Sequence, residues 1–235
     1  MPQNNNILPS REEKMGTVRS MFDSIAGNYE KLNTILTFGL DKNWRKKLLD
    51  HLGLKRGSLI LDVGCGTGDL LRELKSSGLD SVGIDLSLNM IKENDNLGSI
   101  VQGIAENLPF KDNCFDGVVS GFSLRNFVSL DDFFKEAYRI IKPGGRLAVL
   151  DVSEPELPIV KTVHGIWFKK CVPTIGGLLS NKKAYSYLPA STAYLPDEEQ
   201  LKTMLNNLGY LGVSHRKLFF GTVQILDATV PVFKR

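Results

Sequence analysis

Short apolar runs and longer helical patterns alternate through the middle of this chain. The runs have the length of β-strands and occupy residues 58–63, 81–85, 114–120 and 146–152, with one more that begins at Ile100. Alternation at this spacing predicts a doubly wound α/β fold, in which helices cover both faces of a mostly parallel sheet. Two later runs, 213–219 and 222–230, are separated by Phe220-Gly221 and predict an antiparallel hairpin that brings the sheet to seven strands.

The segments that flank this alternating region have different patterns. The first residues are mostly polar, and we expect a flexible N-terminus at 1–16, followed by helices over 17–51. Residues 153–196 contain five prolines and an aromatic-rich centre, which interrupts the rhythm of strands and helices. We therefore expect a partly helical cap, inserted after the fifth strand, that closes over a pocket. An apolar content of 42% over 235 residues is enough for one large core, so we expect a single domain.

Charge and cysteine usage exclude several functions. A net charge of +3 is too small to indicate nucleic-acid binding. Cys65, Cys114 and Cys171 are widely spaced and lack the spacing of metal ligands, so we expect reduced, buried thiols in a cytoplasmic protein and no metal site. The three histidines are scattered and predict surface or core positions. We find neither an apolar signal peptide nor a run of the ~18 apolar residues that would span a bilayer.

Three glycines at alternate positions indicate a ligand-binding loop. The sequence Leu61-Asp62-Val63-Gly64-Cys65-Gly66-Thr67-Gly68-Asp69 lies where a predicted strand gives way to a helical pattern. Glycines permit the tight turn and the close approach of a ligand that a Cβ would hinder. The helix that follows would direct its free N–H groups and the positive end of its dipole towards the same ligand.

The spacing of these glycines favours one kind of cofactor. A nicotinamide or flavin site would read G-x-G-x-x-G, whereas this loop reads G-x-G-x-G. A pyrophosphate is therefore less favoured than a smaller ligand whose carboxylate and amine lie against the loop, as in S-adenosylmethionine. The next predicted strand ends in Asp85, whose carboxylate can accept hydrogen bonds from both hydroxyls of a ribose.

The segment after the third predicted strand adds a family resemblance. It reads Ile104-Ala105-Glu106-Asn107-Leu108-Pro109-Phe110, and Phe115-Asp116 follows in the next strand. This stretch resembles the "AExLPF…FD" region of class I S-adenosylmethionine-dependent methyltransferases. The resemblance implies that the backbone around Ile104 and Ala105 holds the adenine. Many relatives carry Asp or Asn in place of Ile104, so Glu106 or a neighbouring residue would share the recognition of adenine here.

Two longer segments are similar to a narrower family. Residues 29–44 resemble the first signature of the quinone-biosynthesis C-methyltransferases: Tyr29, Asn33 and Trp44 match it, while Glu30, Leu32, Thr37 and Asp41 depart from it. Residues 139–153 resemble the second signature, with Asp151 in place of the usual Glu, and 122–126 is similar to the family's "FGLRN". The resemblance extends from about residue 18 to 230 and therefore covers nearly the whole chain.

The resemblance implies methyl transfer from S-adenosylmethionine to a ring carbon of a quinol. It places cofactor contacts at Asp62, Gly64, Gly66, Thr67, Asp85, Leu86, Ile104, Ala105 and Gly121. Arg125 would stabilise hydroquinolate charge in the manner of an oxyanion hole, Asn126 would orient a ring oxygen and Tyr29 would close the site. Demethylmenaquinol is the expected acceptor. A ubiquinone-precursor benzoquinol and a phylloquinone-type naphthoquinol stay open, as does a non-catalytic binding protein of this fold.

The expected acceptor also implies a location, because a polyprenyl quinol resides in the bilayer. Basic residues at Lys42, Arg45, Lys46 and Lys47, with five more lysines in the insert, would form solvated faces. Near an anionic leaflet such residues contribute ~1 kcal/mol each. We therefore expect a cytoplasmic protein that contacts the inner face of the membrane transiently, and the sequence leaves a homodimer open.

Overall fold

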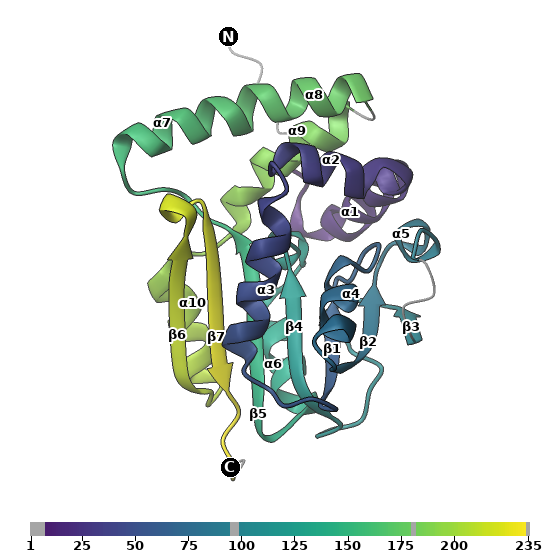
Figure 1. Ribbon diagram of the computed structural model, residues 1–235, viewed down its shortest axis with the longest axis vertical. Coiled ribbons are helices and arrows are strands. Elements are labelled where there is room, and N and C mark those ends of the chain that lie inside the picture. The colour runs from purple at the N-terminus through teal and green to yellow at the C-terminus, as the bar shows by residue number, and fades with distance from the viewer. Residues whose placement is uncertain (1–7, 95–98, 180–181, 234–235) are drawn as a thin grey trace.

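A central sheet between two layers of helices dominates the computed structural model, which describes residues 8–94, 99–179 and 182–233 (Figure 1). The strands lie in the order β3-β2-β1-β4-β5-β7-β6. Their bounds are β1 Leu59–Val63, β2 Asp80–Asp85, β3 Ser99–Gln102, β4 Phe115–Gly121, β5 Ile141–Val152, β6 Leu211–Leu218 and β7 Val223–Thr229. The predicted doubly wound, seven-stranded α/β fold is confirmed.

The pairing of the strands fixes where a ligand can bind. Strands β1 to β5 pair in parallel, whereas β7 runs antiparallel to β5 and β6 antiparallel to β7. The chain order reverses at β1, which lies between β2 and β4. At such a reversal the connections leave the carboxyl ends of the strands in opposite directions, which opens a crevice there. The loops after β1, β2 and β4 therefore meet at one edge of the sheet.

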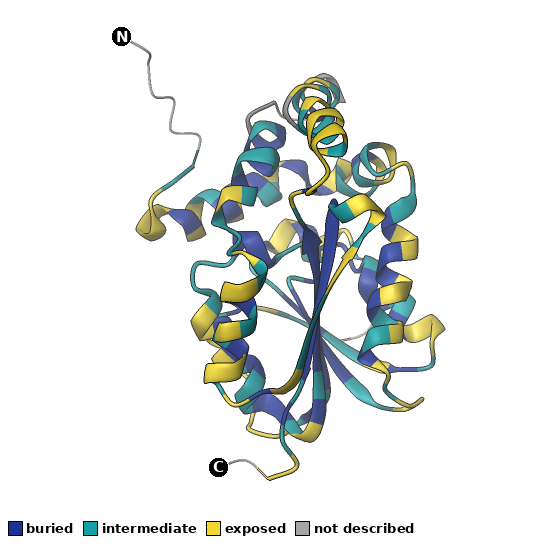
Figure 2. Ribbon diagram, turned by 90° about the vertical axis from the view of Figure 1, so that its left-hand side faces the viewer, coloured by how far each residue is buried: buried dark blue, intermediate teal, exposed yellow. Residues whose placement is uncertain are grey.

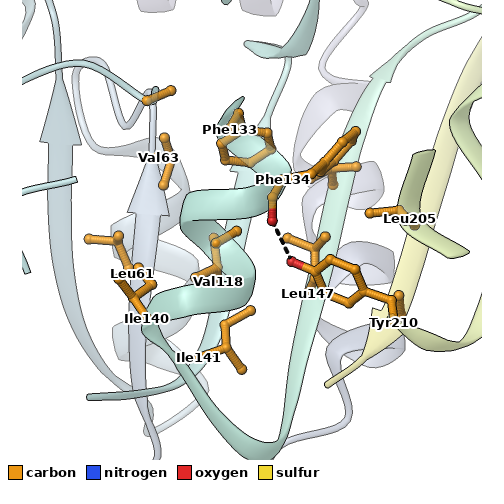
Figure 3. Packing of buried hydrophobic residues seen from close by; sticks show 14 of the residues in the cluster. Leu61, Val63, Val118, Phe133, Phe134, Ile140, Ile141, Leu147, Leu205 and Tyr210 are labelled. Atoms are coloured by element: carbon orange, nitrogen blue, oxygen red, sulfur yellow. Dashed lines mark hydrogen bonds between the residues drawn. The ribbon is translucent and has the colours of Figure 1, made fainter. Parts of the chain in front are cut away.

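Alternate residues of the strands face two separate cores. Leu61 packs with α6 (Leu130–Ile140) and α10 (Glu198–Asn207), whereas Ile60 packs with α3 (Leu40–Leu52) and α4 (Asp69–Ser76). Figure 3 shows the first core, in which the Tyr210 hydroxyl donates to the carbonyl oxygen of Phe134 at 3.0 Å. The buried strands and the outward-facing exposed sides of the helices are apparent in Figure 2. Burial of a large apolar side chain contributes about 1.5–3 kcal/mol, so both layers hold the sheet rigidly in place.

The N-terminal segment differs from the expected flexible N-terminus. Helix α1 (Arg11–Ile25) begins directly after Ser10, whose side chain and that of Glu13 form a capping box. This pairing satisfies free backbone N–H groups of the first turn, and the sequence S-x-x-E is its signal. Residues 1–7 of the expected flexible segment lie outside the described residues. The helices expected over 17–51 correspond to most of α1, α2 (Tyr29–Leu36) and α3.

The segment after β5 is more helical than expected. It contains α7 (Pro158–Ile166), a turn of π-helix at Trp167–Cys171, α8 (Val172–Leu179), α9 (Lys182–Ala190) and a 3-10 turn at Ser191–Tyr194. Pro158 opens α7, where its missing N–H leaves no helical hydrogen bond unmade, whereas Pro189 lies inside α9, one residue before its end. The segment crosses the carboxyl ends of the strands and packs on the N-terminal helices, where Tyr185 lies in one core with Ile25 and Leu32 (Figure 1).

The remaining elements follow the predicted order. Asp197 caps α10, the short helix α5 (Leu88–Lys92) follows β2, and a 3-10 turn, η5 (Phe219–Gly221), joins β6 to β7. The cysteines are unpaired as expected, but only Cys65 is buried, while Cys114 and Cys171 are partly exposed. In the parts of the chain that the structure describes, none of the helices is long and apolar enough to cross a membrane.

Candidate active site

The glycine loop makes the tight turn that its sequence predicts. Gly64, Gly66 and Gly68 adopt φ values of 74°, 54° and 90°, in the left-handed region that favours glycine. A Cβ at Gly64 would lie 2.5 Å from the Oγ of Ser123, so the space is also closed to other residues. The Gly66 N–H donates to an Asp85 carboxylate oxygen at 2.8 Å, which fixes the loop on the end of β2. The loop therefore presents a rigid concave backbone next to two acids.

A hollow of about 980 Å³, measured out to open solvent, lies over this loop. We call it the loop hollow. All nine residues predicted to contact a cofactor line it: Asp62, Gly64, Gly66, Thr67, Asp85, Leu86, Ile104, Ala105 and Gly121. They come from the ends of β1, β2 and β4 and from the segment after β3. The sequence thus located the walls of one site, while each residue's contact with the cofactor stays a prediction.

Asp62 is an ionisable group without a partner at the base of the loop hollow. It is 1% exposed, and neither carboxylate oxygen has a hydrogen-bond partner among the described residues. Burial, and then the negative charge of Asp85, raises the pKa of Asp62 to about 8. Leaving a buried carboxylate unsatisfied is costly, and a cationic amine would remove that cost. The site therefore fits the amino-acid part of S-adenosylmethionine.

Asp85 lies beside Asp62 and faces the same hollow. Its two oxygens accept hydrogen bonds from the backbone N–H groups of Gly66 and Ser87, each at 2.8 Å. Burial raises its pKa to about 6, and the bonds from Ser87 and Gly66 oppose that rise. Asp85 is therefore ionised at neutral pH and can accept further hydrogen bonds from a ribose.

Replacement of Asp85 by alanine is expected to weaken binding of S-adenosylmethionine by about 1–3 kcal/mol, because ribose hydroxyls would lose their buried acceptor. Isothermal calorimetry measures the change, and Asp80→Ala, at the exposed start of the same strand, is the matched control. An unchanged dissociation constant in a folded Asp85→Ala protein would rule out the ribose contact.

One carboxylate oxygen of Glu106 holds a neighbouring loop, and the adenine contact that the sequence leaves open for this residue stays a prediction. Its Oε1 accepts hydrogen bonds from the backbone N–H groups of Val128 and Ser129, at 2.6 Å and 3.3 Å. Glu106 also lines the loop hollow, but this oxygen holds the loop before α6. Recognition of adenine by Glu106 would therefore depend on its other oxygen.

A second hollow of about 970 Å³ lies between the N-terminal helices, the insert and the η5 turn. We call it the aromatic hollow, because Tyr29, Trp44, Phe122, Trp167 and Phe168 are among the residues that line it. Trp44 contacts both Phe122 and Phe219, with ring centroids about 6 Å apart. Such walls suit a flat apolar ring.

The two hollows share a wall. Tyr29, Arg45 and Phe122 line both of them, so a group held in one hollow faces a group held in the other across these three side chains. Burial raises the pKa of Tyr29, which keeps its phenol protonated at neutral pH. Tyr29 is therefore a hydrogen-bond donor at the point where the hollows meet.

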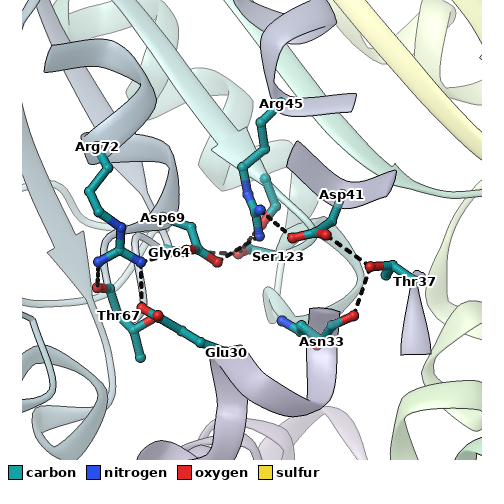
Figure 4. A network of polar contacts seen from close by, with 11 residues as sticks. Glu30, Asn33, Thr37, Asp41, Arg45, Gly64, Thr67, Asp69, Arg72 and Ser123 are labelled. Carbon is teal, nitrogen blue, oxygen red and sulfur yellow. Dashed lines mark hydrogen bonds and ion pairs between the residues drawn. The ribbon is translucent and has the colours of Figure 1, made fainter. Parts of the chain in front are cut away.

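A network of charged residues holds this wall in place (Figure 4). Arg45 pairs with Asp41 on its own helix at 2.5 Å and with Asp69 of α4 at 2.9 Å. Arg72 of α4 then joins Asp69 to Glu30 of α2. Arg45 was expected on a solvated basic face, but it is 6% exposed because two carboxylates satisfy it inside the protein. The network ties α2 and α3 to α4, and Arg72 also donates to the carbonyl oxygen of Thr67 in the glycine loop at 3.3 Å.

Three residues that depart from the family signature take part in this network. Glu30 contacts Arg72, Asp41 contacts Arg45, and the Thr37 hydroxyl donates to Asp41 at 2.9 Å. The three departures from the signature therefore belong to one network of contacts near the aromatic hollow.

The three predicted catalytic residues lie at different places. Tyr29 lies at the shared wall, Arg125 lines the aromatic hollow, and Asn126 lines the loop hollow, where its buried Oδ1 has no partner among the described residues. Arg125 forms a buried ion pair with Asp151, at the end of β5, and donates to the carbonyl oxygen of Phe122 at 2.9 Å. Its Nε is buried without a partner in the described chain. The catalytic roles stay predictions.

Two groups of residues at the site were missed in the sequence. Met15, Val18 and Phe22 of α1 line the loop hollow, and the capping box of that helix was the available signal. His164 of α7 lines the aromatic hollow and stacks on Phe168, with ring centroids 5.0 Å apart. Burial lowers the pKa of His164, so its imidazole is neutral at pH 7. A lone histidine in an insert has no sequence pattern that identifies such a position.

The loop hollow and the aromatic hollow, separated by one shared wall at the carboxyl edge of the sheet, have the arrangement of a class I methyltransferase. Comparison with known proteins agrees. The chain belongs to the ubiE/COQ5 methyltransferase family, whose model matches residues 9–229. The family predicted from the sequence is confirmed.

Individual relatives cover almost the whole chain. A protein of Desulfitobacterium hafniense named demethylmenaquinone methyltransferase is 37% identical over 94% of this chain and 93% of its own length. A Geotalea daltonii protein named ubiquinone/menaquinone biosynthesis C-methyltransferase UbiE is 35% identical over 91% of this chain and 96% of its own. A solved S-adenosylmethionine-dependent methyltransferase of Thermotoga maritima has a TM-score of 0.65 at 20% identity, and the match covers 90% of this chain and 99% of the other. The last match supports the fold.

Proposed function

We propose that this protein is an S-adenosylmethionine-dependent C-methyltransferase that converts demethylmenaquinol to menaquinol. The observation that carries the proposal is the wall of Tyr29, Arg45 and Phe122, which separates a hollow lined by acids and glycines from a hollow lined by aromatic rings. A cationic methyl donor suits the first hollow and a planar quinol suits the second. The names of the relatives at 35% and 37% identity support the same reaction.

The chain binds and orients the donor through the loop hollow. When bound there, S-adenosylmethionine supplies a methyl group already activated on a sulfonium. Asp62 holds a cationic amine, Asp85 accepts from the ribose, and the Gly64 to Gly68 backbone leaves space for close approach. These contacts hold the donor in a fixed orientation, so that methyl transfer to a bound acceptor becomes effectively unimolecular. Such alignment can supply a large part of the lowering of the activation barrier.

The aromatic hollow prepares the acceptor ring. Trp44 and Phe122 offer it flat apolar surfaces. The hydroxyl of the ring passes its proton to solvent, and the guanidinium of Arg125 stabilises the negative charge that is left on the ring oxygen. That charge raises the electron density of the neighbouring ring carbon, which is the nucleophile. The apolar walls exclude water from this position, and the polar contact becomes stronger in the drier surroundings.

An extract assay tests the proposed reaction. Membranes from a strain that lacks this protein are incubated with the purified chain and with S-adenosylmethionine that carries a labelled methyl group, and the lipid quinones are analysed by mass spectrometry. The expected result is label on a naphthoquinone that gains one methyl group. Label on a benzoquinone would instead identify the ubiquinone precursor as the acceptor. Absence of calorimetric binding of S-adenosylmethionine would overturn catalysis altogether.

The acceptor determines where the enzyme works. A polyprenyl quinol stays in the bilayer, so the protein acts in the cytoplasm at the inner face of the membrane. Exposed Lys42, Lys46 and Lys47 on α3 add to attraction by anionic lipid, whereas Arg45 is neutralised inside the protein and does not.

A further inference from the structure

Exposed apolar side chains gather where the aromatic hollow opens to solvent. The set comprises Phe38, Ile159, Val163, Ile166, Phe219 and Phe220, which we call the apolar rim. Ile159, Phe38 and Phe220 are 80%, 72% and 70% exposed. The rim comes from three segments: the turn after α2, the helix α7 and the η5 turn, which lie at the same end of the molecule (Figure 1).

Contacts between these segments make the rim continuous. Phe38 packs on Trp167, the residue directly after α7, with ring centroids 4.9 Å apart. The Ser153 hydroxyl, on the chain that leads into α7, donates to the carbonyl oxygen of Gly221 in the η5 turn at 2.7 Å. Phe38 and Phe219 also line the aromatic hollow, so these two side chains belong both to its wall and to the exposed rim.

The backbone of the rim is strained. Phe38, Phe219 and Phe220 have φ values of 54°, 46° and 55°, in the left-handed region, which costs roughly 1–2 kcal/mol for a residue with a Cβ. Glycine or asparagine would make either turn at a lower cost. Strain of this kind marks positions whose side chains have a function beyond the turn. Here the strain holds large apolar rings outwards, into water.

The charges around the rim match an anionic surface. The two carboxylates that precede α7, Glu154 and Glu156, are paired with Lys161 and Lys217. Lys42 and Lys170 are exposed within four residues of Phe38 and Ile166, and the whole chain has a net charge of +3. An apolar surface with cations at its edge can insert between acyl chains while the cations meet the headgroups.

We propose that the apolar rim is the surface by which this protein docks on an anionic lipid bilayer. The proposal rests on the proposed function: the quinol ring enters the aromatic hollow between Phe38 and Phe219, while its prenyl tail remains in the membrane. Docking places the open mouth of the hollow at the acyl chains, so the tail never crosses water. The inserted side chains, rather than the lysines alone, carry the binding.

The test uses substitutions that lie on the rim but outside the aromatic hollow. Phe220→Asn keeps a residue that tolerates the left-handed backbone, and Ile159→Gln and Val163→Gln keep good helix formers in α7. The matched control is Phe233→Asn, because Phe233 is 85% exposed and lies in the segment after β7, which leaves the sheet at the end opposite α7 (Figure 1). The full-length proteins are floated with vesicles of phosphatidylcholine mixed with the anionic lipid phosphatidylglycerol, because an anionic surface attracts basic residues.

The partition coefficient of the triple variant on vesicles should be at least about tenfold lower than that of the wild type. Burial of one large apolar side chain already changes an equilibrium constant by about this factor. The control should float like the wild type. Methyl transfer is measured with a demethylated naphthoquinol bearing one prenyl unit in solution and with a long-tailed one in vesicles. The triple variant should retain the first activity and lose most of the second.

Three results would overturn the docking surface. The first is equal flotation of the wild type and the triple variant, and the second is absence of wild-type flotation. The third is a dimer in sedimentation equilibrium that dissociates in the triple variant while flotation stays unchanged. The last result would assign the rim to a second copy of this chain. Flotation of the wild type that the triple variant loses, without methylation of either quinol by the wild type, would support the surface and overturn the proposed function, so the two failures are distinguishable.

Discussion

Replacement of Arg125 by alanine is expected to lower turnover about 100-fold or more, the loss seen when one oxyanion donor is removed. The dissociation constant of S-adenosylmethionine should change little, because Arg125 lines the aromatic hollow and not the loop hollow. Arg125→Lys should restore part of the rate, since lysine keeps the charge but loses the planar fork. Single-turnover kinetics and calorimetry give the two quantities separately.

The ion pair with Asp151 requires a control for folding. Arg125→Ala removes the cation from the buried Asp151 carboxylate, which keeps only hydrogen bonds from backbone N–H groups such as those of residues 125 and 152. Loss of one partner of such a buried pair costs about 3–5 kcal/mol. The double variant Arg125→Gln/Asp151→Asn removes both charges together and should fold. If it turns over at the wild-type rate, Arg125 is structural. A loss of turnover together with cofactor binding would lead to the same conclusion.

Asp62→Asn is expected to make the protein more stable and its cofactor binding weaker. The pKa of Asp62 is about 8 in the folded chain and near 3.8 in the unfolded chain, so folding favours the protonated form. The resulting destabilisation is absent below pH 4 and increases as the pH rises to 8. One pKa unit corresponds to about 1.36 kcal/mol, so the gain in the free energy of unfolding at pH 8 should amount to several kcal/mol.

The same substitution should remove a pH dependence of binding. A cationic amine prefers the ionised carboxylate, so wild-type affinity for S-adenosylmethionine should rise from pH 6 to pH 8, with release of a proton. Calorimetry in buffers of different ionisation enthalpy measures that proton. Asp62→Asn should bind at least about tenfold more weakly at pH 8, as expected for loss of a buried charged partner, and release none. Equal proton release by both proteins would exclude Asp62 as the amine site.

The parts of the site that the sequence predicted depend on local geometry. The residue type at Gly64, Gly66 and Gly68 by itself indicates a left-handed backbone. Asp62 and Asp85 lie at the ends of strands that must meet at one edge of a parallel sheet. Neither inference needs knowledge of distant contacts. The same applies to β6 and β7, whose short connection leaves little choice but a hairpin.

The parts that were missed depend on contacts between distant segments. Arg45 is buried because Asp69, on another helix, supplies a second carboxylate, and no local pattern reports that pairing. His164 reaches the aromatic hollow only through the path of the whole insert. The left-handed backbone at Phe38 and Phe220 could not be predicted from the sequence either, because a positive φ is not expected for phenylalanine.

The chain contains two tryptophans, Trp44 and Trp167, and both line the aromatic hollow, whereas neither lines the loop hollow. Trp44 lies against Phe122 and Phe219, and the Trp167 indole N–H donates to the carbonyl oxygen of Leu36. The tryptophan fluorescence of the unmodified protein is therefore a reporter confined to the aromatic hollow. A quinone in that hollow would quench it directly, so occupancy of the acceptor side can be titrated without a label and independently of the methyl donor.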